Sequence, residues 1–128
     1  MRECVAVMKI KHFNELDCWK KARELVRLIY SLTSKSQFSK DYGLRDQIQR
    51  AAVSIMANIA EGFGTKSNQE FVRYLSIAIR SAFEVQSHLY VALDVVYINQ
   101  DEFDKTDSLV NDCINLCKGL IRYLKQKT

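Results

Sequence analysis

Proline is absent from this 128-residue chain, and glycine occurs only four times. Both residues interrupt helices, so their scarcity favours long, unbroken helical segments. Apolar residues recur every three or four positions over long stretches, whereas alternating β-branched runs are few. This period is typical of amphipathic helices. The sequence therefore predicts an all-α protein.

Membrane and secretion signals are also missing from the sequence. No apolar run approaches the roughly 20 residues of a membrane-spanning helix. Residues 1–11 carry charges at Arg2, Glu3, Lys9 and Lys11, which is unlike a secretory segment. The cysteines form no disulfide framework and no CxxC pair; they are Cys4, Cys18, Cys113 and Cys117. We therefore expect a cytoplasmic protein without a membrane partner.

Catalytic and metal-binding motifs are scarce. Di-iron helical bundles use Glu-x-x-His pairs, but neither His12 nor His88 has a glutamate three residues before it. Cys113 and Cys117 lie one helical turn apart without a matching histidine pair, so we expect them to be core thiols. A glycine-rich phosphate loop is absent. The sequence predicts a protein that is not an enzyme and holds no metal or cofactor.

Four stretches carry the helical period and should share one core. The first is expected from a cap at Asn14 to Thr33, the second from Ser39 or Asp41 to Gly62, the third from a capping box at Ser67–Glu70 to Val96, and the fourth from a cap at Asn99 onward. Because short connections return each helix beside its predecessor, we predict an antiparallel up-down-up-down four-helix bundle over residues 13–128, after a tail at 1–12.

Inward-facing positions follow from the same period. Phe38, in the polar connection after the first helix, should close one end of the core. The expected inner stripes are Leu16, Trp19, Ala22, Val26, Ile29 and Thr33 in the first helix, Phe71, Leu75, Ala78, Ala82, Val85, Leu89, Ala92 and Val96 in the third, and Phe103, Leu109, Cys113, Leu116, Leu120 and Leu124 in the fourth.

Two stretches are apolar on nearly every side. Only Ser54 and Asn58 are polar between Ala51 and Ala60, and only Asp94 is polar in Leu89–Ile98. A helix that is apolar all round must be covered all round, so both stretches are expected to form subunit contacts. Asn58 is expected to join a hydrogen-bond network to the first or third helix, with a ligand or subunit contact as the alternative.

The end of the second helix is marked by Glu61 and Gly62. Glycine adopts the left-handed conformation of a helix C-terminal cap without a Cβ penalty. We therefore expect Gly62 to be that cap.

Basic residues slightly outnumber acidic ones, giving a net charge of +4. This is a weak indication of an anionic partner. The cations of the first helix would also fit a solvated surface. Those of the last turns of the fourth helix would fit a favourable interaction with the helix dipole. Arg50 would fit a salt bridge to an acidic neighbour. The nucleic-acid-binding candidates are Lys20, Arg23, Arg27, Arg45, Arg50, Arg73, Arg80, Lys118, Arg122 and Lys125.

A family resemblance rests on the run YGLRDQIQRAAVSIMANIAEG at 42–62, together with FNELDCWKKARELVRLIYSLT before it and SNQEFVRYLSIAIRSAFEVQSHLYVA after it. Its signature includes Trp19 and the segment Asn58-Ile59-Ala60-Glu61-Gly62. Over about residues 13–123, the chain resembles the bacterial 23S rRNA intervening-sequence proteins. It departs from them at Ser39 and Met56, where the family often has proline, so a kink in the second helix should be weaker.

The resemblance implies a ring-shaped homo-oligomer, commonly of five subunits, without known catalytic residues. A related branch comprises the accessory proteins of diversity-generating retroelements, which bind a reverse transcriptase and nucleic acid. We therefore expect a non-enzymatic homopentamer that binds RNA or DNA, directly or as an accessory to a nucleic-acid enzyme such as a reverse transcriptase. The alternative is a scaffold that binds only protein.

Overall fold

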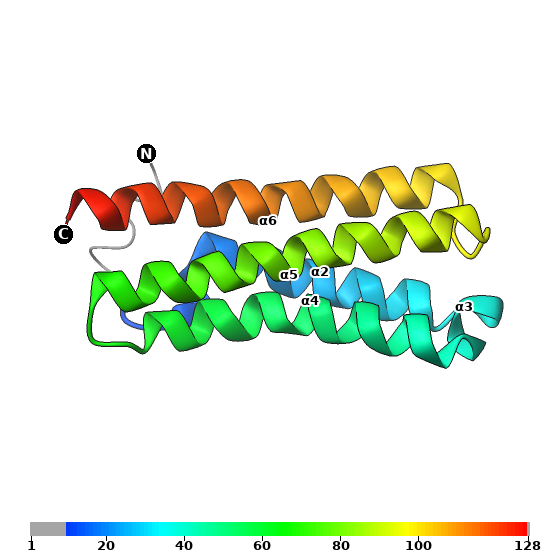
Figure 1. The fold of residues 1–128 in the computed structure, drawn as a ribbon, viewed down its shortest axis with the longest axis horizontal. Coiled ribbons are helices and arrows are strands. Elements are labelled where there is room, and N and C mark those ends of the chain that lie inside the picture. The colour runs from blue at the N-terminus through cyan, green and yellow to red at the C-terminus, as the bar shows by residue number, and fades with distance from the viewer. Residues whose placement is uncertain (1–9, 128) are drawn as a thin grey trace.

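The computed structural model describes residues 10–127, so most of the predicted tail lies outside the described residues. Its elements are the 3₁₀ turn η1 (Phe13–Glu15) and the helices α2 (Asp17–Thr33), α3 (Ser36–Lys40), α4 (Tyr42–Phe63), α5 (Asn68–Asp94) and α6 (Gln100–Gln126). The four long helices run antiparallel to their neighbours, and α6 closes the bundle against α2 (Figure 1). The predicted four-helix bundle is confirmed, while the short helix α3 was not predicted.

The core runs along the whole bundle, and Phe38 closes one end of it with 1% of its surface exposed, as predicted. Helix α2 buries Ala22 and Ile29 as expected, but it also buries Leu25 and Leu32. Trp19 and Val26, which were expected inside, are only partly buried. Helix α2 packs against both α4 and α6. Its buried side therefore faces the space between these two helices and differs from the predicted inner stripe.

The start of the first helix differs from the prediction. Asn14 is not a cap, because it lies inside η1, and α2 begins at Asp17 after Leu16 in the cap position. The Glu15 carboxylate accepts hydrogen bonds from the backbone N–H groups of Lys11 and His12, at 3.2 and 3.0 Å. Glu15 therefore satisfies backbone donors ahead of η1, and its side chain does not cap the start of α2.

Gly62 is not the helix cap that the sequence suggested. Helix α4 continues through it to Phe63, and Gly64 follows in a right-handed conformation with φ of −77°. A Cβ placed on Gly62 would lie 2.8 Å from Phe71 Cδ1 and 2.8 Å from Tyr74 Cβ. The missing side chain therefore lets α4 approach α5 closely, and the glycine serves packing and not a turn.

Helix α5 stops at Asp94, short of the predicted end at Val96. Val96 has a left-handed φ of 63° and is 81% exposed, so it does not continue the inner stripe. Its N–H donates to the Leu93 carbonyl at 3.0 Å, and the Tyr97 N–H donates to the Ala92 carbonyl at 2.9 Å. This pair of bonds is a Schellman motif, in which glycine usually occupies the position of Val96.

Asn99 and Ser67 cap α6 and α5 as predicted, but the capping box predicted at Ser67 and Glu70 is only half formed. Asn99 and Glu102 form a reciprocal capping box at the start of α6. Ser67 accepts a hydrogen bond from the Glu70 N–H at 3.1 Å, while the Glu70 carboxylate pairs with Arg73. In α6, Leu109 and Leu116 are only partly buried, whereas Val110, Ile114 and Cys117 are buried beside Cys113. Both α6 thiols are therefore core residues, as predicted.

Candidate nucleic-acid interface

Charge is divided along α6. Its first half, residues 100–112, contains Asp101, Glu102, Asp104, Asp107 and Asp112 with a single basic residue, Lys105. Its second half, residues 113–127, contains no acidic residue and four basic ones: Lys118, Arg122, Lys125 and Lys127. All four basic side chains are exposed. The helix therefore presents positive charge at one end of the bundle and negative charge at the other.

The topology adds further cations to the positive end. The end of α6, the loop between α4 and α5, and the start of α2 all lie at the same end of the bundle (Figure 1). We call this the basic end, and its cations are Lys20, Arg23, Lys66, Arg73, Lys118, Arg122, Lys125 and Lys127. Lys66 and Lys127 were not among the predicted site residues. Lys66 could have been found from the up-down topology, which brings its loop to the end of α6.

Helix α5 also contributes to this surface. Gln86 on α5 donates to Asp107 and Asn111 on α6 at 3.0 and 2.9 Å. Because the helices are antiparallel, each step forward along α6 corresponds to a step back along α5, which places Lys118 level with residues 75–79 of α5, next to Arg80. By the same register Lys125 is level with residues 68–72, next to Arg73. The predicted cations of α5 and α6 therefore belong to one half of the bundle.

These cations differ in their existing partners. Arg73 Nε lies 3.1 Å from Glu70 Oε2, and this hydrogen bond raises the pKa of Arg73. Within residues 10–127, none of Arg80, Lys118, Arg122 and Lys125 takes part in an ion pair. Those four side chains can therefore approach an anion without breaking an ion pair to a described carboxylate.

The predicted cations of α2 lie in mixed surroundings. Lys20, Arg23 and Arg27 are exposed, and the Arg23 guanidinium lies 5.8 Å from the centre of the Trp19 ring. Nearby, Lys21 is 3.6 Å from Glu24 and 3.9 Å from Asp112. The acidic neighbours reduce the positive potential of this face, so α2 supports the basic end at its start and less so toward Arg27.

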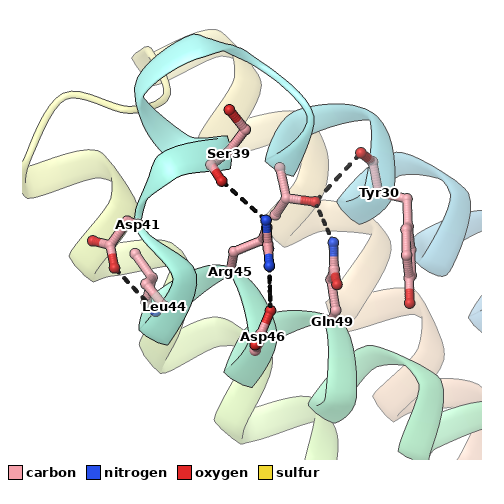
Figure 2. Close-up of polar contacts among 8 residues, drawn as sticks. Tyr30, Ser39, Asp41, Leu44, Arg45, Asp46 and Gln49 are labelled. Atoms are coloured by element: carbon pink, nitrogen blue, oxygen red, sulfur yellow. Dashed lines mark hydrogen bonds and ion pairs between the residues drawn. The ribbon is translucent and has the colours of Figure 1, made fainter.

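Arg45 is already held by neighbouring groups. Figure 2 shows its guanidinium between Ser39 and Asp46. It donates to the Ser39 carbonyl at 3.1 Å and to Asp46 Oδ1 at 3.1 and 3.0 Å. It also lies 4.8 Å from the centre of the Tyr42 ring. The contact with Ser39 joins α3 to the start of α4, and Arg45 therefore already has three local partners, Ser39, Asp46 and Tyr42.

Arg50 lies apart from the basic end. It is exposed and lines an open hollow of about 450 Å³ together with Tyr30, Asp46, Gln49, Val53 and Ser54. Beside the hollow, Gln49 donates to Thr33 Oγ1 at 2.9 Å, which links α4 to α2 (Figure 2). No ion pair in the described part of the chain includes Arg50. The salt bridge considered for it is not formed with any described residue.

Asn58 forms the expected type of network. Its Nδ2 donates to the Ser54 carbonyl at 2.8 Å and to Ser54 Oγ at 3.0 Å. Ser54 Oγ lies 2.9 Å from Ser81 Oγ on α5. The network therefore reaches α5 through the hydroxyl groups of Ser54 and Ser81 and not directly from the Asn58 amide. Glu61, the other polar residue of the signature, is exposed.

Both over-wide apolar stretches are partly exposed. The first forms an apolar hollow of about 310 Å³, lined by Phe13, Trp19, Val53, Met56, Ala57 and Ala60. The second leaves Tyr90, Val91, Val95 and Val96 exposed near the end of α5. Exposed contiguous apolar surface of this kind is typical of interaction sites.

Fold and surface define a four-helix bundle in which charge is separated along α6. In residues 10–127, no helix is both long and apolar enough to cross a membrane. The chain belongs to the 23S rRNA-intervening sequence protein family, whose model matches residues 14–119.

A solved structure supports this assignment. The chain is similar to a Bacteroides thetaiotaomicron protein of unknown function from the S23 ribosomal protein family, with 25% identity and a TM-score of 0.75. The match covers 81% of this chain and 97% of that protein. No curated protein matches the chain.

Proposed function

We propose that this protein is a non-enzymatic nucleic-acid-binding bundle, which acts alone or as an accessory to a nucleic-acid enzyme such as a reverse transcriptase. The observation that supports it best is the separation of charge along α6, where residues 113–127 carry four basic and no acidic side chains. Such a surface attracts an extended anion, and the phosphate backbone of RNA or DNA is the most abundant one.

The contacts within the basic end favour phosphates over base edges. Lys118, Arg122 and Lys125 are exposed on a convex helix and are not fixed by described carboxylates. Sequence-specific recognition requires side chains that are held in position against base edges in a groove of the nucleic acid. Phosphate contacts need only accessible positive charge. Binding should therefore depend weakly on sequence and strongly on salt.

We further propose that the protein assembles into a closed ring, with five subunits as the family resemblance implies. The apolar hollow between α2 and α4 is the surface that supports this, because Trp19, Val53 and Met56 would otherwise remain in contact with water. Symmetric copies would bring several basic ends toward one ligand and add their fields. Light scattering at micromolar concentration should give the mass of a pentamer, and a monomer mass would overturn the assembly.

Gel-shift titration tests the nucleic-acid interface directly. The probes are a structured RNA and a duplex DNA, each at a low and a high salt concentration. The variant Arg122→Gln with Lys125→Gln should weaken binding by about tenfold or more, because two phosphate contacts per subunit are lost. The matched control, Arg27→Gln with Arg50→Gln, removes the same charge outside the basic end and should have a much smaller effect.

Two outcomes would contradict the proposal. Equal losses for the two double variants would mean that net charge, and not the basic end, attracts the ligand. Absence of binding to both probes at low salt, with the assembly intact, would favour the alternative function of a scaffold that binds only protein.

A further inference from the structure

The last turns of α5 expose an unusual amount of apolar surface. Of the nine large apolar side chains exposed in residues 10–127, five lie here: Phe83, Tyr90, Val91, Val95 and Val96. Their spacings of four and seven residues bring them to one outward side of the helix and its turn. We call this set the distal patch. From Phe83 to Val95 it is about 18 Å long, which suits a docked helix of about three turns.

Acidic residues lie within and beside the far end of the distal patch, where Lys105 is the single basic residue of the first half of α6. Asp94 lies within it, and the ring of Tyr90 packs 4.8 Å from that of Phe103, which brings the acidic start of α6 alongside. In the described part of the chain, Asp94, Asp101 and Asp104 form no ion pair, and Asp104 accepts only a neutral hydrogen bond, from Gln100 at 2.9 Å. The patch therefore combines apolar side chains with uncompensated negative charge.

Val96 keeps its exposed side chain at the cost of backbone strain. The left-handed conformation costs an L-residue about 1–2 kcal/mol, and a β-branched residue is a particularly rare occupant. Tyr97 holds this conformation in place, because its hydroxyl donates to Asp41 Oδ2 at 2.9 Å and its ring packs 5.3 Å from Phe38. Strained residues fixed by their surroundings concentrate at functional sites.

We propose that the distal patch docks a basic amphipathic helix of another protein. The apolar face of such a helix would cover Tyr90, Val91 and Val95, and its lysine and arginine side chains would reach Asp94 and Asp101. A nucleic acid is disfavoured here because the acidic residues repel phosphates. A second copy placed with the same face is also disfavoured, since Asp94 and Asp101 would meet their own equivalents, and the ring contact proposed above uses the hollow between α2 and α4. The inference does not depend on the proposed nucleic-acid binding.

Fluorescence anisotropy with a defined probe tests the docking. The probe is a synthetic labelled peptide with leucine at helical spacing on one face and lysine elsewhere. Its control is the same peptide with glutamate in place of lysine. We expect the lysine peptide to bind the full-length protein and the glutamate peptide not to bind.

Matched variants locate the contact. Val95→Ser should weaken peptide binding by about tenfold, whereas Tyr30→Ser on α2 removes a larger apolar side chain at a comparable exposure, 47% against 49%, and should leave binding unchanged. Asp94→Asn should weaken binding, and Glu61→Gln, an exposed acid at the basic end, should not. All four positions are exposed, so the fold should be retained, and circular dichroism checks this.

Three results would overturn the proposal. One is that the lysine peptide fails to bind the folded protein. Another is that Tyr30→Ser weakens binding as much as Val95→Ser, which would indicate general adhesion. The third is that Val95→Ser reduces the mass of the assembly in light scattering, because a second copy of the chain would then be the occupant of the patch.

Discussion

At Gly62, α4 and α5 approach so closely that a methyl group would overlap Phe71 and Tyr74. Gly62→Ala should therefore lower the free energy of unfolding by about 1–3 kcal/mol, the usual cost of overpacking. Gly119→Ala is the matched control, because its added Cβ would meet only Arg122 Nη2, at 3.7 Å. Alanine should stabilise α6 there by about 0.5–1 kcal/mol. Urea unfolding measures both, and equal effects would contradict the close-packing role.

The buried thiol of Cys113 provides a pH-dependent prediction. Burial, with a smaller effect from Cys117, raises its pKa from 9.0 to about 12. The thiol should resist iodoacetamide at neutral pH in the folded protein and react only after unfolding. Mass spectrometry of the peptide that contains Cys113, with and without urea, measures this. Rapid labelling of the folded protein would show that α6 opens locally.

The same shift affects stability at high pH. Because the folded-state pKa lies above the unfolded value, Cys113 contributes stability below pH 9 that is lost as the pH rises toward about 12. The variant Cys113→Ala should lack this component. Denaturation curves give the difference in free energy of unfolding between the two proteins at neutral pH and at pH 8 and above. The change in that difference with pH reports the thiol alone, because the lysines and tyrosines that titrate in the same range are common to both proteins.

At the scale of an element, the end of α5 is under strain at Val96. Val96→Gly should raise the free energy of unfolding by about 1 kcal/mol, because the left-handed penalty exceeds the added flexibility of glycine. The control Val95→Gly lies in a right-handed conformation, with φ of −90°, and should destabilise the protein. Thermal unfolding measures both.

Val96→Gly also separates stability from binding. If the distal patch docks a basic helix, this variant should be more stable and yet bind the lysine peptide more weakly. A loss of stability in Val96→Gly would mean that the valine side chain makes contacts worth more than the strain.

The four long helices could be predicted from the sequence, but several of their ends could not. The apolar period identifies the four long helices, because each must bury one face against the others. The ends depend on contacts that are distant in sequence or on competing local caps. Tyr97 is tied to Asp41, 56 residues away, and this contact fixes the turn at Val96 although the apolar period continues. At the start of α2, Asn14 lies inside the turn η1, and Leu16 takes the cap position that the residue type of Asn14 suggested for it.

At the scale of the whole molecule, the basic end could be predicted only in part. The cations are visible in the sequence, but their positions depend on which helix ends meet. Arg45 and Arg122 are equally basic in the sequence, yet Arg45 is held by Ser39 and Asp46 while Arg122 is exposed. One of these two partners, Ser39, lies in the unpredicted helix α3. The surroundings of Arg45 therefore depend on α3, a short segment whose polar sequence predicts only a connection between helices.

The separation of charge along α6 gives a prediction for salt dependence. Each cation that neutralises a phosphate contributes about 0.9 to the slope of log Kobs against log salt. Lys118→Gln should therefore reduce the slope by about 0.9 or more, according to how many subunits contact the ligand. Lys105→Gln is the matched control, since Lys105 is also an exposed lysine of α6 but lies among the acidic residues of its first half.

Titration of duplex DNA over a range of salt concentrations measures both slopes. Lys105→Gln should leave the slope unchanged, because Lys105 contacts no phosphate if the ligand lies on the basic end. An equal reduction in the two variants would show that the ligand senses the summed charge of the assembly. A reduction confined to Lys105→Gln would place the nucleic acid at the acidic end, against the field of Asp101 and Asp104, and would contradict both the proposed interface and the proposed docking site.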